Sequence, residues 1–344
     1  MGDRTQAADF APLHELSKGA AAGLRIAVCI CTYRRPRQLA RLLDHLDAQS
    51  FGRTPRPDVI VVVVENEAGG PAKAVCDSRG GGARLLYDVE PTPGVPAARN
   101  KCLELAAGIS DFIVLIDDDE TPHRDWLDCL LAAQRDTGAD VVTGPCFADF
   151  EQTPPGWISR GEFHDSPMAR THNHFPLQKF APAGTGTPLR SSDSGNVLFR
   201  SEIVRHTSIR FDPSIGPYGY GADNLFFRTV ARQGFSIAWV ADARVTHVIP
   251  PERATLRWLL RRTFQQGICT TVVAQRMGAP ARERFLHFAG AGAKVALLPW
   301  LFPFLIFYPA EYAVWNMIRV LQALGVVLGS LGVRVRYNRR AVAP

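Results

Sequence analysis

The sequence lacks the cysteine and lysine patterns that mark several common protein classes. Seven cysteines occur in 344 residues, but no CxxC pair exists and no histidine follows at zinc-finger spacing, which argues against a structural zinc site. Most of the cysteines lie within apolar runs, so we expect reduced, buried thiols. Only five of the 39 basic residues are lysine, so the net charge of +6 is carried by arginine. An arginine surplus suits diphosphates, acidic lipid headgroups or nucleic acid.

The chain also lacks the apolar stretch that a secretory signal would place in residues 1–23, which are polar and alanine-rich. We therefore expect a flexible N-terminal segment over residues 1–23 and a protein on the cytoplasmic side of the cell membrane. Internal repeats and low-complexity segments are absent as well. The hydrophobic content of 46% and the charged content of 21% are typical of a folded globular protein.

Short apolar runs that predict strands alternate with helical patterns over residues 25–143. The plainest strand, residues 59–64, consists of five valines and one isoleucine. One helix face is predicted by the spacing of Leu39, Leu42, Leu43 and Leu46. Such alternation indicates an α/β fold with a mostly parallel central sheet covered on both faces. We predict this domain over residues 24–250 and a basic helical segment over residues 251–284.

Asp117, Asp118 and Asp119 follow directly after the predicted strand 112–116, with Glu120 next. Adjacent carboxylates repel one another unless they are solvated or share a cation. Strand ends of an open α/β sheet are also where ligands bind, and hard divalent cations take carboxylate and diphosphate oxygens together. The functional interpretation is a divalent metal on Asp119, with Asp117 at the ribose or sharing the metal. The alternative is a solvated acidic turn that caps the next helix.

Two other predicted strands end in polar side chains. The first runs into Thr32, Tyr33 and Arg35, which offer a hydroxyl, an aromatic face and a guanidinium group. The second ends at Glu65 and Asn66, which can hydrogen-bond to a base or a ribose. Because parallel strands end at the same edge of a sheet, we expect these side chains to converge with the acidic cluster in one crevice.

A Pro-Gly turn at residues 93–94 leads into a small-residue segment with Arg99. This arginine would balance a diphosphate or the acidic cluster, or lie on the surface as an ordinary arginine. Further along, a flexible polar turn suited to sugar hydroxyls is formed by Ser194, Gly195 and Asn196.

Asp223 follows a glycine-rich loop at the start of an apolar helix. It fits two roles: the N-cap of that helix, or the general base that removes a proton from an acceptor hydroxyl. Direct displacement at an anomeric carbon by such a hydroxyl inverts the configuration. His247 follows a short strand and is open to a structural or a ligand-binding role.

In this order the motifs resemble those of family-2 glycosyltransferases with the GT-A fold. The shared succession is Thr-Tyr-x-Arg, an acid-Asn pair, Gly-x-x-x-Ala-Arg-Asn and Asp-Asp-Asp, each after a strand or turn of the predicted sheet. The downstream Ser-Gly-Asn, the glycine-rich loop before Asp223 and the His247-x-x-Pro motif look most like the bacterial exopolysaccharide, succinoglycan-type branch. The resemblance covers roughly residues 25–267.

The resemblance implies a Rossmann-like GT-A domain that transfers a sugar, with inversion, from a nucleoside-diphosphate donor to a glycan or lipid-linked acceptor. We predict a UDP-sugar donor, Mn²⁺ or Mg²⁺ held by Asp119 and His247, Asp223 as general base, and no nucleic-acid partner. The predicted nucleotide site comprises Thr32, Tyr33, Arg35, Glu65, Asn66, Arg99, Asp117 and Asp118. Acceptor or sugar contacts are predicted at Ser194, Gly195, Asn196 and Ala222.

Two positions depart from the family pattern. Members of the family usually carry Glu-Asp at the base position, whereas this chain has Ala222-Asp223, which puts the acceptor contacts in question. Glu65 stands where many relatives have aspartate.

The C-terminal region is apolar and contains no uninterrupted span of ~20 residues, the length that a transmembrane helix needs. Residues 295–310 are apolar or proline, and residues 312–333 are interrupted by polar side chains. We predict a helical, apolar membrane-associating region over residues 285–344, peripheral or monotopic, lying in the cytoplasmic leaflet with arginines at the headgroups. A transmembrane pair and a soluble helical cap are the alternatives.

Three other functions fit parts of the pattern. The run from Asp117 to Thr121 matches the DxDx[TV] motif of haloacid-dehalogenase-type phosphatases, but it lies on about the fourth strand rather than the first. A nucleotidyltransferase would need a glycine- and lysine-rich nucleotide loop, which this sequence does not contain. A catalytically inactive sugar-nucleotide-binding protein would keep the acidic cluster without a base.

Overall fold

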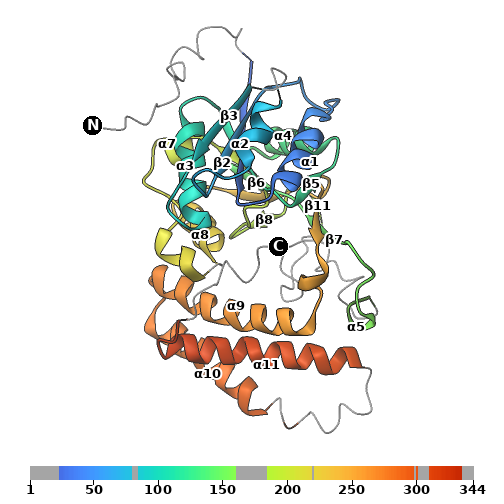
Figure 1. Cartoon of the computed structure of the whole chain (residues 1–344). Helices are drawn as coiled ribbons and strands as arrows, with labels where there is room; N and C mark the ends of the chain where they lie inside the picture. The colour runs from blue at the N-terminus through green and yellow to red at the C-terminus, as the bar shows by residue number, and fades with distance from the viewer. Residues whose placement is uncertain are drawn as a thin grey trace, which may run out of the picture.

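An eight-stranded mixed sheet lies at the centre of the N-terminal part of the molecule (Figure 1). The structure is a computed structural model that describes residues 23–79, 84–159, 184–218, 221–297, 300 and 310–334. The strand order is β3-β2-β1-β4-β9-β6-β10-β8. The strands are β1 (Arg25–Thr32), β2 (Asp58–Glu65), β3 (Arg84–Val89), β4 (Phe112–Asp117), β6 (Val141–Thr143), β8 (Pro188–Leu189), β9 (Asn196–Arg200) and β10 (Ile237–Trp239). The predicted segment 1–23 lies almost entirely outside the described residues.

Helices cover both faces of the sheet because successive strand residues point to opposite sides. Ile26, Val28 and Ile30 of β1 pack with α1 (Pro36–Asp47), α2 (Ala72–Asp77) and α4 (Trp126–Thr137). Ala27 and Cys29 pack on the other side with α3 (Val95–Ala107), α7 (Glu202–Arg205) and α8 (Ala222–Arg232). The predicted two-sided α/β sheet is therefore confirmed.

The register of the parallel strands brings the predicted strand ends to one edge. Thr32 pairs with Glu65 across β1 and β2, and Cys31 pairs with Asp117 across β1 and β4. β9 and β8 run antiparallel to their neighbours, so the sheet is mostly rather than wholly parallel.

A second, three-stranded sheet closes over this edge. It consists of β5 (Glu120–Pro122), β11 (Val245–Ile249) and β7 (Cys146–Phe150) in the order β5-β11-β7. The antiparallel pairing of β5 and β11 sets His247 opposite Glu120. The short strands β5 and β7 were not predicted from the sequence. They place His247 next to the turn that carries the acidic cluster.

The C-terminal part consists of helices set apart from the sheet (Figure 1). α9 (Leu256–Arg276) follows the 3₁₀ turn η2 (Pro251–Arg253), and α10 (Ala281–Leu297) and α11 (Ala310–Ser330) come after it. The domain boundary predicted at residue 284 falls inside α10. Among the helices that the structure describes, none combines the length and apolar character needed to cross a membrane. Of the apolar and proline-containing stretch 295–310, residues 298–299 and 301–309 lie outside the described residues.

Glycines let α9 and α11 approach each other closely. A Cβ atom at Gly325 would collide with the carbonyl oxygen of Phe264, and one at Gly267 would collide with that of Gln322. Such backbone-to-backbone packing requires residues without side chains.

We expect Gly325→Ala to lower the free energy of unfolding by about 1–3 kcal/mol, because the added methyl group must push the two helices apart. Gly290→Ala in α10 is the control, since a Cβ atom there meets nothing within 4 Å. Denaturant unfolding of both variants measures the difference. Equal stability of Gly325→Ala and the parent chain would show that α9 and α11 do not pack in this way.

Candidate active site

The turn between β4 and β5 carries the acidic cluster at the edge where β1 and β2 also end. Asp117 is the last residue of β4, and its backbone N–H donates to Oε2 of Glu120 over 3.0 Å. Glu120 is fully buried, and a Cβ atom at Gly195 would collide with its carboxylate. The Glu120 carboxylate therefore holds the turn in place through Asp117, and Gly195 packs directly against it.

Asp118 points back into the domain rather than toward solvent. It accepts hydrogen bonds from Thr32 Oγ1 and from Arg35 Nη1, both over 2.8 Å. Burial raises the pKa of Asp118 to about 6, against the opposing effect of Arg35. Thr32 and Asp118 thus hold the turn in place, and the predicted nucleotide contacts of these two residues have no direct support in the geometry.

Asp119 is surrounded by cationic and imidazole groups from three separate segments. Its Oδ2 lies 2.9 Å from Nη1 of Arg35 and 3.3 Å from Nη1 of Arg253, and its Oδ1 lies 3.4 Å from Nδ1 of His247. Although burial alone would raise the pKa of Asp119, His247, Arg35 and Arg253 together hold it well below its ordinary value. Asp119 is therefore a carboxylate that stays ionised.

The surroundings of Asp119 fit a divalent cation. Nδ1 of His247 is buried and has no hydrogen-bond partner, although it faces the Asp119 carboxylate. A buried ring nitrogen whose nearest polar neighbour is a carboxylate oxygen at 3.4 Å is poorly satisfied unless a ligand completes its contacts. Within the described part of the chain, no group of three or more His, Cys, Asp or Glu side chains could hold a metal. A protein with one or two ligands of its own commonly relies on substrate phosphates for the rest.

Arg99 links the acidic cluster to the helix that carries Asp223. Its Nη2 donates to Oδ1 of Asp117 over 2.9 Å, and its guanidinium group lies 5.5 Å from the ring centroid of Phe211. Burial alone would lower the pKa of Arg99, but Asp117 and Asp223 raise it above its ordinary value. Arg99 is thus a buried cation paired with Asp117, so the alternative of a surface arginine is wrong.

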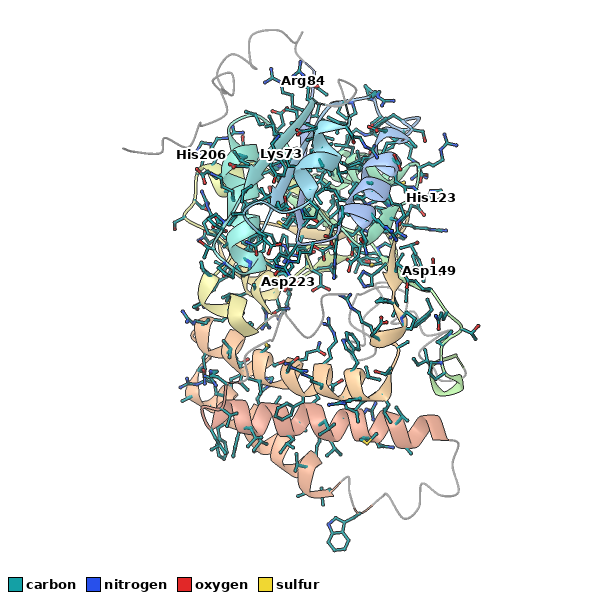
Figure 2. All side chains as sticks on the ribbon, in the orientation of Figure 1. Lys73, Arg84, His123, Asp149, His206 and Asp223 are labelled. Atoms are coloured by element: carbon teal, nitrogen blue, oxygen red, sulfur yellow. The ribbon has the colours of Figure 1, made fainter. Side chains whose placement is uncertain are left out.

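Asp223 lies in the first turn of α8, whose N-cap is Gly221 with φ of +91°. The N-cap role that the sequence left open for Asp223 is therefore wrong. Its Oδ1 accepts from the backbone N–H of Asn224 over 3.0 Å, and its Oδ2 lies 3.5 Å from the hydroxyl of Ser194. Figure 2 shows Asp223 at the margin of the α/β part that faces α9.

Glu65 and Asn66 organise the protein rather than point toward a ligand. Oε1 of the fully buried Glu65 accepts from the Ala72 N–H over 3.0 Å, and Oε2 accepts from the Tyr87 hydroxyl over 2.7 Å. The Asn66 side chain ties down the loop after β3, donating to Glu90 and Thr92 carbonyls and accepting from the Gly94 N–H. Both side chains thus have hydrogen-bond partners within the protein, and their contact with a base or ribose stays a prediction.

Two of the predicted sugar contacts are also occupied elsewhere. The buried Asn196 amide accepts from the Trp126 indole over 2.7 Å and donates to the carbonyls of Pro145 and Ala243. Ala222 is buried in the hydrophobic core. Both residues therefore hold the sheet and α8 together, and their contact with sugar stays a prediction. Gly195 does line a pocket, together with Ser191, Ser192 and Trp239.

One arginine of the site, Arg253, was not assigned from the sequence. Arg253 reaches Asp119 from η2, 134 positions away in the chain. Arg34 has a φ of +55°, a conformation that side-chain-bearing residues rarely adopt. The guanidinium group of Arg34 pairs with Glu67 and lies 5.2 Å from the ring centroid of Tyr33. This left-handed residue turns the chain so that Arg35 reaches the acidic cluster.

Sequence comparison identifies the family. The profile of Glycosyl transferase family 2 matches residues 27–207, which is more than half of the chain. The chain belongs to this family. It is 34% identical to the succinoglycan biosynthesis protein ExoM of Rhizobium meliloti over 250 residues, 71% of this chain and 73% of that protein. It is 22% identical to a glucosyl-dolichyl phosphate glucuronosyltransferase of Haloferax volcanii, over 73% of this chain and 77% of that protein.

Solved structures share the fold of this glycosyltransferase. The mannosyltransferase PcManGT from Pyrobaculum calidifontis, in complex with GDP-Man and Mn²⁺, superposes with a TM-score of 0.56 and 18% identity over 92% of each chain. S. aureus TarS superposes with a TM-score of 0.51 and 14% identity, over 90% of this chain and 55% of that chain. The family assignment confirms the resemblance and the glycosyltransferase activity, and it removes the phosphatase and nucleotidyltransferase alternatives.

Proposed function

We propose that the chain transfers a sugar from a nucleoside-diphosphate donor to an acceptor hydroxyl with inversion at the anomeric carbon. The observation that carries this proposal is the meeting of Asp119, His247 and two arginines at the sheet edge, with Arg99 paired to Asp117 beside them. One half of this arrangement suits a leaving diphosphate, and the other half suits an attacking hydroxyl.

Asp119 and His247 would hold the divalent ion, which when bound acts as a Lewis acid toward the leaving diphosphate. Mn²⁺ in the PcManGT complex supports this choice of cofactor, with Mn²⁺ or Mg²⁺ as candidates. Arg35 and Arg253 present guanidinium groups to the same place, where charge develops as the donor bond breaks. Arg99 pairs with Asp117 and balances its charge.

Asp223 is the proposed general base. Its carboxylate is partly exposed, and the nearby Ser194 hydroxyl and Asn224 N–H orient it. In a single displacement it accepts the proton of the acceptor hydroxyl as that oxygen bonds to the anomeric carbon. A catalytically inactive protein of the same fold has no need of a carboxylate at this position.

The donor is proposed to be a UDP-sugar, and the acceptor a glycan or a lipid-linked oligosaccharide. The names of the Rhizobium and Haloferax relatives, which refer to succinoglycan and to a dolichyl phosphate, support the acceptor class. A screen of UDP- and GDP-sugars with purified protein, Mn²⁺ and membrane lipid extract, reading nucleoside diphosphate release, tests the proposal. Consumption of no nucleotide sugar would sink it.

A peripheral location at the cytoplasmic membrane surface is proposed from the exposed surface of α10. Within Ala281–Leu297, all of which the structure describes, Ala291 is the one buried residue. Large apolar side chains are exposed at Phe285 (65%), Leu286 (56%), Leu297 (66%) and the following Trp300 (77%). Exposed basic side chains accompany them at Arg282, Arg284 and Lys294. Apolar and basic groups together suit an anionic lipid surface.

The double variant Phe285→Asp/Leu286→Asp is expected to lower binding to anionic lipid vesicles by at least about tenfold. It replaces two apolar side chains, which would insert among the lipids, by two negative charges. Vesicle sedimentation at fixed salt measures the binding. Arg135→Asp on α4 is the matched surface control, because it makes the same change of two charge units at an exposed side chain. Undiminished sedimentation of the α10 variant would remove this helix from membrane binding.

A further inference from the structure

Two arginines and a histidine surround the Asp119 carboxylate, and a metal ion bound there would compete with the arginines. Oδ2 contacts both Arg35 and Arg253, while Oδ1 faces His247. A divalent cation on Asp119 and His247 would stand beside both guanidinium groups. Since like charges at this range repel, the protein's own arginines oppose the cation when it binds alone.

The two arginines are held unequally. Nη1 of Arg35 bridges Asp118 and Asp119 at 2.8 and 2.9 Å, so it keeps a carboxylate partner whatever happens at Asp119. Nη1 of Arg253 lies 3.3 Å from Asp119 and 3.5 Å from Nε2 of His247. Both contacts of Arg253 are longer than a usual charge-assisted hydrogen bond, and both involve the two proposed metal ligands. Arg253 is therefore the arginine whose partner changes.

A diphosphate reverses the sign of this interaction. It brings negative oxygen atoms to the cation, and a guanidinium group binds such oxygens well. Arg253 then gains a partner instead of losing one. The same side chain opposes the cation alone and favours the cation together with a diphosphate.

We propose that Arg253 makes divalent-cation binding and nucleoside-diphosphate binding interdependent, by occupying Asp119 until a diphosphate provides its new partner. This inference rests on the proposed metal site at Asp119 and His247. Under this proposal the cation and the donor bind together rather than one after the other. Arg253 then contacts the donor diphosphate.

The test is a Mn²⁺ titration of the full chain, followed by the EPR signal of free Mn²⁺ at constant ionic strength. Each protein is titrated alone, with saturating UDP and, in parallel, with GDP, after correction for Mn²⁺ bound by free nucleotide. We expect Arg253→Gln to bind Mn²⁺ alone at least about fivefold more tightly than the parent chain. The tightening that nucleotide adds should shrink by a similar factor. Arg253→Met, which also removes the charge, should give the same signs.

Arg257→Gln is the matched control, because it removes one exposed arginine a single turn further along the same basic segment and should leave both quantities unchanged. Thermal unfolding confirms that each variant is folded. If Arg253→Gln and Arg253→Met bind Mn²⁺ alone no more tightly, or keep the full effect of nucleotide, the inference is overturned. If Asp119→Asn binds Mn²⁺ as well as the parent chain does, the proposed metal site itself fails, which is a different result.

Discussion

Asp223→Asn is expected to lower the rate of sugar transfer by about 10²- to 10⁴-fold, the range that a general base contributes. The amide keeps the size of the side chain: its oxygen can still accept from the Asn224 N–H, and its NH₂ group can donate to the Ser194 hydroxyl oxygen. It cannot take the proton of an acceptor. Donor binding should stay within about twofold, since the arginines and carboxylates that would meet the diphosphate are untouched.

Steady-state transfer and equilibrium binding of the donor nucleotide, measured on the same preparation, separate these two effects. Asp136→Asn on the exposed side of α4 controls for the loss of a carboxylate as such. Turnover of Asp223→Asn at the parent rate would exclude this carboxylate from the mechanism.

Asp119→Asn is expected to reduce transfer by about 10³-fold or more, because the neutral amide is a poor ligand for a hard cation and several kcal/mol of charge stabilisation would be lost. It also leaves Arg35 and Arg253 without their shared carboxylate. Unlike the Asp223 variant, this one should show weaker Mn²⁺ binding.

Raising the Mn²⁺ concentration should recover part of the activity of Asp119→Asn but none of that of Asp223→Asn. Folding is checked by near-ultraviolet circular dichroism, since the carboxylate is an integral part of the turn. Full activity of Asp119→Asn at low Mn²⁺ would contradict the role given to this residue.

Most of the sheet could be predicted because its strands are dictated by local composition. The valine run 59–64 forms the middle of β2, and the helix predicted over 95–107 is α3. In each segment the pattern of apolar residues favours one kind of secondary structure, in which those side chains are buried. The three-residue β5 and the half-exposed β7 carry no such signal, because each is stabilised by pairing with β11, far away in sequence.

The location of the site was predictable, whereas the direction of its side chains was not. Parallel register forces Thr32, Glu65 and Asp117 to one edge. Glu65 is held inside the protein because the Tyr87 hydroxyl and the Ala72 N–H donate hydrogen bonds to its carboxylate. Neither donor can be identified from the spacing of residues in the sequence. Short polar motifs thus identify a region, and the packing around them decides which members remain available.

Arg253 shows the limit of sequence reasoning most clearly. It appeared as one of several arginines in a basic segment, with nothing local to set it apart from Arg257. Its contact with Asp119 arises because β11 pairs with β5 and thereby carries η2 to the acidic turn. Only tertiary structure distinguishes the two arginines.

Pulsed EPR of Mn²⁺ bound to the full chain with UDP tests the central claim most directly. Echo modulation from a directly bound imidazole nitrogen is expected in the parent chain, because Nδ1 of His247 lies buried and without a hydrogen-bond partner beside Asp119. His247→Gln should abolish the modulation. Bound Mn²⁺ without nitrogen modulation, or modulation that persists in His247→Gln, would contradict a metal centre built on these two residues.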